Sequence, residues 1–89
     1  MRIVWHEEKR RQNLIKHKLD FRDAAAVFDG PTFTIEDDRL NYYEQRWITS
    51  GLLNGQVVLI VHTETGNTVR IISMRKATQY EQILFFTRL

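Results

Sequence analysis

Apolar and polar residues follow two different patterns along the chain, and the pattern changes near residue 31. The first segment, RIVW at Arg2–Trp5, is short and apolar, and it predicts an edge strand. From His6 to His17 the residues favour a helix in which only Leu14 and Ile15 provide an apolar stripe. So thin a stripe predicts a helix that lies on the surface of the protein.

A second helix is predicted between Asp20 and the pair Gly30-Pro31. Asp20 is a favourable N-cap, because its carboxylate can accept a hydrogen bond from the backbone N–H of Asp23. Asp23 adds negative charge to the first turn, where the helix dipole favours it. Gly30 and Pro31 end the helix. Its buried face is expected to consist of Ala24, Ala25, Val27 and Phe28.

After Pro31 the pattern becomes that of an antiparallel sheet, with strands predicted over 32–37, 45–53, 56–64 and 68–75. Asn54-Gly55 predicts a hairpin, because both residues tolerate the positive φ of a type I′ turn. Two further turns are expected, a polar one over Asp37–Tyr43 and a tight one over Thr65–Asn67. Residues 57–61 (VVLIV) are apolar at successive positions, so their strand should be central and covered on both faces.

Thr78–Glu81 fits a capping box and predicts a last helix that carries Ile83, Leu84 and Phe85. The predicted order is therefore β-α-α-β-β-β-β-α in a single domain of residues 1–89. The fold class is α+β, a compact antiparallel β-meander with two N-terminal helices and one C-terminal helix.

Composition excludes several classes of protein. There are no cysteines, which rules out disulfides and thiolate metal sites. No apolar run approaches the roughly 18 residues of a membrane span, and the N-terminus has no signal-type apolar region, so we expect a cytoplasmic protein without membrane association. The net charge of +2 is too small to indicate nucleic-acid binding by itself. Basic residues crowd the first helix: Lys9, Arg10, Arg11, Lys16 and Lys18.

Common catalytic and cofactor motifs are absent from the sequence. The histidines His6, His17 and His62 lack the spacing of a zinc site. The four glycines are explained by turns or strand ends, which leaves no phosphate-binding loop, and there is no Gly-x-Ser-x-Gly elbow. We therefore expect no metal and no cofactor, and we exclude conventional hydrolases and nucleotide enzymes.

Cations within the predicted strands are the remaining candidates for chemistry. Arg46 lies in the second strand of the meander, Arg70 in the last one, and Arg75 and Lys76 at its end. An arginine on an apolar strand must extend to solvent, pair with a carboxylate, or face a groove that binds an anion. The pairing and groove alternatives both remain open at this point. Three carboxylates could form such pairs: Glu44, Glu64 and Asp37.

Strict alternation along the last strand separates two of these arginines. Arg70 is expected to share a face with Met74, whereas Arg75 is expected to point with Val69 and Ile71.

Four pieces of the sequence together resemble a known family. They are W-x-E-x-K at the start, N-x-x-K-H at the corner after the first helix, RWITxG, and RIISxRKA. In this order, over Ile3 to about Glu81, they are similar to the BrnT toxins of bacterial type II toxin–antitoxin systems.

The resemblance implies a RelE-like fold and a metal-independent endoribonuclease. In such an enzyme the RNA supplies its own nucleophile, the 2′-hydroxyl, while the protein supplies a base, an acid and cations. It also implies a cognate antitoxin of the BrnA type, whose DNA-binding part lets the complex reach operator DNA and repress its own operon. Toxin and antitoxin would then assemble as a complex, for which a heterotetramer is one arrangement.

Arg46, Arg70 and Arg75 match arginines of the family pattern, and the resemblance implies that they bind phosphate. Lys16 and His17 match its Lys-His corner, so this corner is expected to form one lip of the RNA groove, together with Lys76 as a further RNA-binding cation. The alternative for His17 is structural, because a histidine at the end of a helix can cap the last carbonyls.

Proton-transfer groups are less well defined. His62 near the end of a buried strand could act as acid or base, but a histidine beside Val58 and Ile60 can equally be a core residue. Glu64 could act as the base if an arginine orients it. Tyr80 could stack on a nucleobase or fill the core.

Three positions depart from the family pattern. His6 replaces an aspartate, which removes an N-cap, and Lys18 replaces a glycine, which costs up to about 1 kcal/mol if that position needs positive φ. Thr65 stands where an arginine is common. These departures keep a second hypothesis open, a weak or inactive toxin homologue that serves as an antitoxin-binding module in operon regulation. A nucleic-acid-binding protein without a partner is a third, against which the modest charge argues.

Overall fold

The computed structural model describes residues 1–41 and 43–89. Its element order confirms the predicted β-α-α-β-β-β-β-α, with the second helix divided into a 3-10 turn and an α-helix. Tyr42, part of the predicted turn Asp37–Tyr43, lies outside the described residues. The elements are β1 (Arg2–Trp5), α1 (Glu7–His17), η1 (Phe21–Asp23), α2 (Ala24–Asp29), β2 (Thr32–Glu36), β3 (Trp47–Leu53), β4 (Gln56–Thr65), β5 (Thr68–Lys76) and α3 (Gln79–Arg88).

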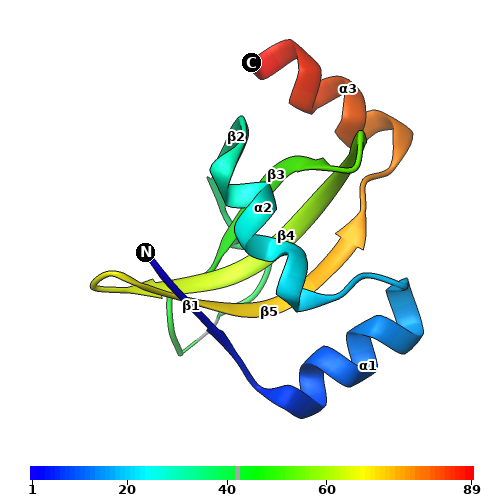
Figure 1. The fold of residues 1–89 in the computed structure, drawn as a ribbon. Coiled ribbons are helices and arrows are strands. Elements are labelled where there is room, and N and C mark those ends of the chain that lie inside the picture. Colours follow the sequence, from blue (N-terminus) through cyan, green and yellow to red (C-terminus); the bar gives the residue numbers. More distant parts are fainter. Residues whose placement is uncertain (42) are drawn as a thin grey trace.

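One five-stranded sheet, in the order β1-β5-β4-β3-β2, forms the centre of the protein (Figure 1). β1 is the predicted edge strand and pairs in parallel with β5, whereas β2 to β5 form the predicted antiparallel meander. Val57 to Ile60 are all buried, so β4 is covered on both faces as expected. Asn54 and Gly55 both have positive φ, 51° and 80°, which confirms the hairpin turn.

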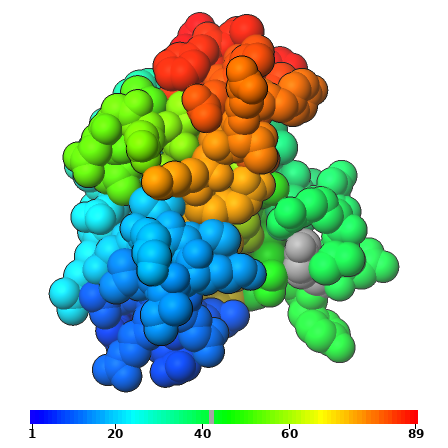
Figure 2. Space-filling view, turned by 90° about the vertical axis from the view of Figure 1, so that its right-hand side faces the viewer, coloured from blue at the N-terminus to red at the C-terminus, as the bar shows by residue number. Residues whose placement is uncertain are grey.

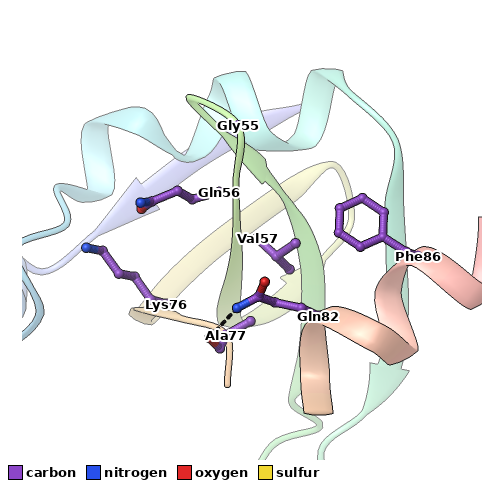
Figure 3. A pocket seen from close by; sticks show the side chains of 7 residues that line it. All are labelled: Gly55, Gln56, Val57, Lys76, Ala77, Gln82 and Phe86. Carbon is purple, nitrogen blue, oxygen red and sulfur yellow. Dashed lines mark hydrogen bonds between the residues drawn. The ribbon is translucent and has the colours of Figure 1, made fainter. Parts of the chain in front are cut away.

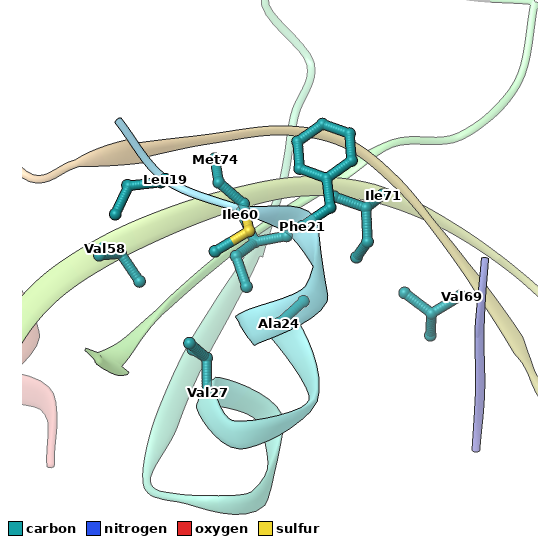
Figure 4. Close-up of a cluster of buried hydrophobic side chains, with 9 residues drawn as sticks. All are labelled: Leu19, Phe21, Ala24, Val27, Val58, Ile60, Val69, Ile71 and Met74. Carbon is teal, nitrogen blue, oxygen red and sulfur yellow. The ribbon is translucent and has the colours of Figure 1, made fainter. Parts of the chain in front are cut away.

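The hydrophobic core fills the space between the sheet and the segment η1–α2, which crosses one face of it (Figures 1 and 4). Phe21, Ala24 and Val27 of this segment are fully buried, whereas Ala25 is exposed, so the expected buried face was wrong at that position. The sheet contributes side chains from its two central strands. They are Val58, Ile60, Val69, Ile71 and Met74.

Asp20 caps the start of η1 but with a different partner from the predicted one. Its carboxylate accepts a hydrogen bond from the backbone N–H of Arg22, at 3.0 Å, while the N–H of Asp23 donates to the backbone carbonyl of Asp20. The same carboxylate also accepts two hydrogen bonds from Arg10, which ties α1 to η1. These bonds lower the pKa of Asp20 below its ordinary value.

α1 is a surface helix, as predicted, but its expected apolar stripe does not hold it in place. Ile15 is 73% exposed and Leu14 37%. The buried residue of α1 is Asn13, whose side chain hydrogen-bonds to the backbone of Met74 in β5. A polar anchor on the edge of β5 therefore replaces apolar packing.

The C-terminal helix α3 begins as predicted. Thr78 accepts a hydrogen bond from the backbone N–H of Glu81, and the Glu81 carboxylate accepts one from the N–H of Thr78, which completes the capping box. Phe85 is its fully buried residue, and the helix packs near β2. None of the helices in the described ranges is long and apolar enough to cross a membrane.

Candidate functional site

A β-bulge in β5 places Arg70 and Arg75 on the same face of the sheet. Arg75 pairs with Leu59 and Arg70 with Thr63, but the register shifts between them because Ile72 is an extra residue in β5. Leu59 and Thr63 are separated by an even number of residues and so lie on the same face of β4. Their partners Arg75 and Arg70 therefore lie on that face as well. This corrects the expectation from strict alternation. Val69, Ile71 and Met74, predicted on different faces, are all in the core on the opposite side.

Arg46 lies one residue before β3, not within the strand as predicted, and it approaches Arg70 through a shared carboxylate. Glu44 accepts a hydrogen bond from Arg70, and its carboxylate lies 4.0 Å from the Arg46 guanidinium. All three side chains are between 28% and 46% exposed. One negative charge is thus set between two positive ones on an open surface.

Arg75 is held by two hydrogen bonds to Glu81 on α3, both 2.8 Å long. The hydrogen bonds from Arg75 are the largest cause of the low pKa of Glu81, about 2, and those same bonds raise the pKa of Arg75. Glu44, which was one of the carboxylates considered from the sequence as an arginine partner, pairs with Arg70. Glu81, the partner of Arg75, was not among those carboxylates.

A fourth arginine on this face, Arg39, was not identified from the sequence. It makes two hydrogen bonds, 2.6 and 2.8 Å long, to the carboxylate of Asp37, whose side chain is fully buried. Arg39 and Arg75 line the same cavity, and the positive charge of Arg39 acts on the pKa of Arg75. We call the sheet face opposite η1 and α2 the arginine face. Arg39, Arg46, Arg70 and Arg75 lie on it, and Arg2, which pairs with Thr68, lies at its outer edge.

His62 lies on the other face, within the core. It is fully buried, its Nε2 lies 2.7 Å from the hydroxyl of Thr49, and its ring packs edge-on against Phe28 at 5.2 Å. The Thr49 hydroxyl is in turn 2.8 Å from that of Thr34. Burial is the main cause that lowers the pKa of His62, so the ring is neutral near pH 7.

Glu64 lies on the same side of the sheet as His62, with its carboxylate 3.8 Å from Nδ1 of the ring. Glu64 pairs with Val69, a core residue, whereas Thr65 alternates onto the arginine face beyond Arg70. The structure therefore does not bring either predicted proton-transfer residue to the arginines. The position where the family commonly has an arginine, Thr65, would have extended their row.

Lys16 and His17 line a depression between the end of α1 and the bulge of β5, together with Ile72 and Ser73. In the view of Figure 2, α1 (blue) and the end of β5 (orange) form one continuous surface. Ser73 pairs with Val61 and so belongs to the arginine face. The Lys-His corner thus adjoins the edge of that face, as the groove hypothesis requires.

Lys76 lies on the opposite face of the sheet from the arginines, and Tyr80 lies in the first turn of α3. Lys76 pairs with Val58, whose side chain is in the core, and it lines a pocket of about 220 Å³ with Gln56, Gln82 and Phe86 (Figure 3). The Lys76 and Gln56 side chains extend to the same side in this view. Tyr80 is 68% exposed on α3, which excludes the core-filling alternative for this residue.

Comparison with known families identifies the family of this chain. No curated protein sequence matches the chain significantly. Residues 5–81 match the family described as ribonuclease toxin, BrnT, of type II toxin–antitoxin systems, and the match extends from the end of β1 to the third residue of α3. Arg39, Arg46, Arg70 and Arg75 all lie within it. The chain therefore belongs to the BrnT family of ribonuclease toxins, which implies endoribonuclease activity and a cognate antitoxin.

Proposed function

We propose that this protein cleaves RNA without a metal ion, by attack of a 2′-hydroxyl on the neighbouring phosphate, and that the arginine face binds the RNA backbone. The observation that carries the proposal is the gathering of four arginines on one face of the sheet, two of them brought there by the bulge in β5. Guanidinium groups suit this task, because their planar fork matches phosphate oxygens and stays charged at all relevant pH values.

The ion pairs of these arginines are compatible with phosphate binding. The Glu44 pairs of Arg46 and Arg70 are half exposed, and such pairs typically contribute only about 0–1 kcal/mol, so a phosphate can replace that carboxylate at small cost. The carboxylates bonded to Arg39 and Arg75 are less exposed, so a phosphate there would bind beside the ion pair instead of replacing it. Arg46 and Arg70 both lie against Glu44, so a phosphate that replaced this carboxylate could contact two guanidinium groups. Lys16 and His17, beside the bulge, would hold the RNA at the edge of the same face.

Glu44 is the proton acceptor in this proposal. It is a half-exposed carboxylate oriented by an arginine, which is the arrangement expected of the base, and it lies on the arginine face. His62 and Glu64 are on the opposite face and have no part in the proposed chemistry. Attack by the 2′-oxygen breaks the bond to the 5′-oxygen and gives a 2′,3′-cyclic phosphate and a 5′-hydroxyl.

The family also supports a proposal about the partner. We infer an antitoxin of the BrnA type that neutralises the enzyme and carries a DNA-binding part, through which the complex, for which a heterotetramer is one arrangement, represses its own operon. The product of the adjacent gene, co-expressed with this chain, should restore growth and co-purify with it.

RNA cleavage by the purified protein in the presence of EDTA tests the activity. We expect fragments with cyclic-phosphate ends, and we expect Arg70→Ala and Arg75→Ala to lower the cleavage rate by roughly 10²–10³-fold, the range for loss of one charge-stabilising donor. Arg22→Ala is the matched control, because Arg22 is an exposed arginine on η1 at the other side of the sheet. An Arg70→Ala or Arg75→Ala protein that cleaves as fast as the control would remove that side chain from the site.

Two further measurements separate binding from chemistry. Glu44→Gln should abolish most cleavage while RNA still binds, and the affinity for RNA should fall with salt with a log–log slope of roughly −0.7 per phosphate contact. Antitoxin binding and operator repression without any RNA cleavage would instead favour the antitoxin-binding module, for which the threonine at position 65 is the relevant observation.

A further inference from the structure

A cavity of about 190 Å³ opens on the arginine face between the sheet and α3. Most of its wall is apolar, although Ile35 is 48% exposed to solvent. Pockets for drug-sized ligands measure roughly 300–1,000 Å³, so this cavity suits a single planar ring system. Its apolar wall consists of Phe33, Ile35, Ile48, Leu59 and Leu84.

Ser50 contributes a polar group to this wall. It lies in β3 between Phe33 and Leu59 of the neighbouring strands and is only 9% exposed. Within residues 1–41 and 43–89, its hydroxyl makes no hydrogen bond. This oxygen is not among the buried polar atoms that lack a partner, so it reaches solvent in the cavity. A hydroxyl can both donate and accept, and an apolar ligand that covered it would leave it without a partner, which is unfavourable. A ligand with a polar edge would satisfy it.

Two arginines and the carboxylate of Glu81 lie at the rim of the cavity. Arg39 and Arg75 both line it, and each is bonded to one carboxylate, Asp37 or Glu81. Arg70 and Arg46 lie further along the same face. An apolar recess beside a row of arginines is complementary to a nucleic-acid strand, whose phosphates are anionic and whose bases are flat and apolar on their faces.

We propose that this cavity binds one nucleobase of the RNA, next to a phosphate held by Arg75, and that Ser50 contacts the edge of that base. This inference rests on the proposed RNA cleavage and names the part of the site that determines sequence preference. An apolar side chain of the antitoxin would also fit the wall, but it would leave the Ser50 hydroxyl without a partner. A nucleobase fits both features, because its flat faces can pack against the apolar wall and its polar edge can hydrogen-bond to the Ser50 hydroxyl.

Binding of short RNA oligonucleotides with 2′-O-methyl groups tests this, because they lack the attacking hydroxyl and cannot be cleaved. Replacing one nucleotide at a time by an abasic unit should weaken binding at one position, by roughly 5- to 100-fold, the range for loss of a stacked base. Leu84→Trp, which fills the cavity, should weaken binding of intact RNA and abolish the effect of that abasic position. Ile83→Trp is the matched control, because Ile83 is an exposed neighbour on α3 that does not line the cavity.

Ser50→Ala gives a second readout that leaves the apolar wall in place. It should change the relative affinity for the four bases at that same position by about 2- to 10-fold, the effect of one neutral hydrogen bond. Equal sensitivity to abasic units at every position, or an unchanged base preference in Ser50→Ala, would overturn the proposal. So would a Leu84→Trp protein that loses antitoxin binding but keeps its binding of RNA.

These outcomes are independent of the proposed function. Wild-type protein that cleaves RNA with a preference unaffected by Ser50→Ala would leave the enzyme assignment intact and reject the cavity. Position-specific binding without cleavage would support the cavity and reject the chemistry.

Discussion

The side-chain amide of Asn13 pairs with both backbone groups of Met74, as a neighbouring strand would. Its nitrogen donates to the Met74 carbonyl at 2.9 Å, and its oxygen accepts from the Met74 N–H at 3.0 Å. The same nitrogen also donates to the carbonyl of Leu19, at 3.1 Å. Asn13 thereby satisfies the backbone hydrogen-bonding groups of β5 at a position that β1 does not reach, and it holds α1 beside the bulge.

Replacing Asn13 by alanine should destabilise the protein by at least about 1–3 kcal/mol, because backbone groups near the core lose their partners. Urea unfolding measures the change in the free energy of unfolding. Gln12→Ala, at the exposed neighbouring position of α1, should change it by no more than about 0.5 kcal/mol. Equal effects of the two substitutions would show that the Asn13 hydrogen bonds contribute little.

The left-handed backbone at Lys18 gives a substitution that should stabilise the protein. Lys18 follows α1 with φ 60° and ψ 25°, and its N–H donates to the carbonyl of Leu14. Glycine adopts this conformation without a steric penalty, so Lys18→Gly should raise the free energy of unfolding by about 0.5–1 kcal/mol.

The control for Lys18 is the same change two residues earlier. Lys16→Gly, inside the last turn of α1, should lower stability by about 1 kcal/mol. If both substitutions destabilise to the same extent, the backbone at position 18 carries no strain.

His6 stands at the N-cap of α1 but forms no side-chain capping bond, as the departure from the family pattern predicts. Its backbone is extended, with φ −86° and ψ 125°, which is the conformation that a capping residue needs. His6→Asp and the uncharged His6→Ser should each raise stability by about 0.5–2 kcal/mol relative to His6→Ala in thermal or urea unfolding. A serine variant no more stable than the alanine variant would contradict this.

His62 should make stability depend on pH below about 6.5. Because burial lowers the pKa of His62 in the folded protein, the unfolded chain binds the proton first as the pH falls. Its contribution is therefore fully present above the unfolded pKa of 6.5 and is lost below it, at up to about 1.4 kcal/mol per pH unit until the folded pKa is reached.

The measurement is the free energy of unfolding between pH 7.5 and about 5. His62→Gln is the comparison, because glutamine keeps a polar group near Thr49 but does not titrate in this range. The wild type should lose more stability than the variant over this interval. Parallel pH profiles of the two proteins would show that the buried His62 ring does not cause the loss of stability at low pH.

Local chemistry within the sequence was sufficient for the elements and their order. Asn54-Gly55 predicts its turn because few residue pairs accept positive φ, Thr78 and Glu81 cap α3 with each other, and the continuous apolar run of β4 is stable only at the centre of a sheet. Each of these signals lies within a few residues of the structure that it determines.

The tertiary structure decided where the arginines face and which carboxylates they meet. The extra residue Ile72 reverses the alternation in β5, and nothing in the local sequence indicates it, because a bulge depends on how β5 pairs with β4. The pairing of Arg75 with Glu81 and of Arg70 with Glu44 likewise depends on how helix and loop pack against the sheet. Side-chain periodicity is a local property, whereas register and partner choice arise from contacts between segments distant in the chain.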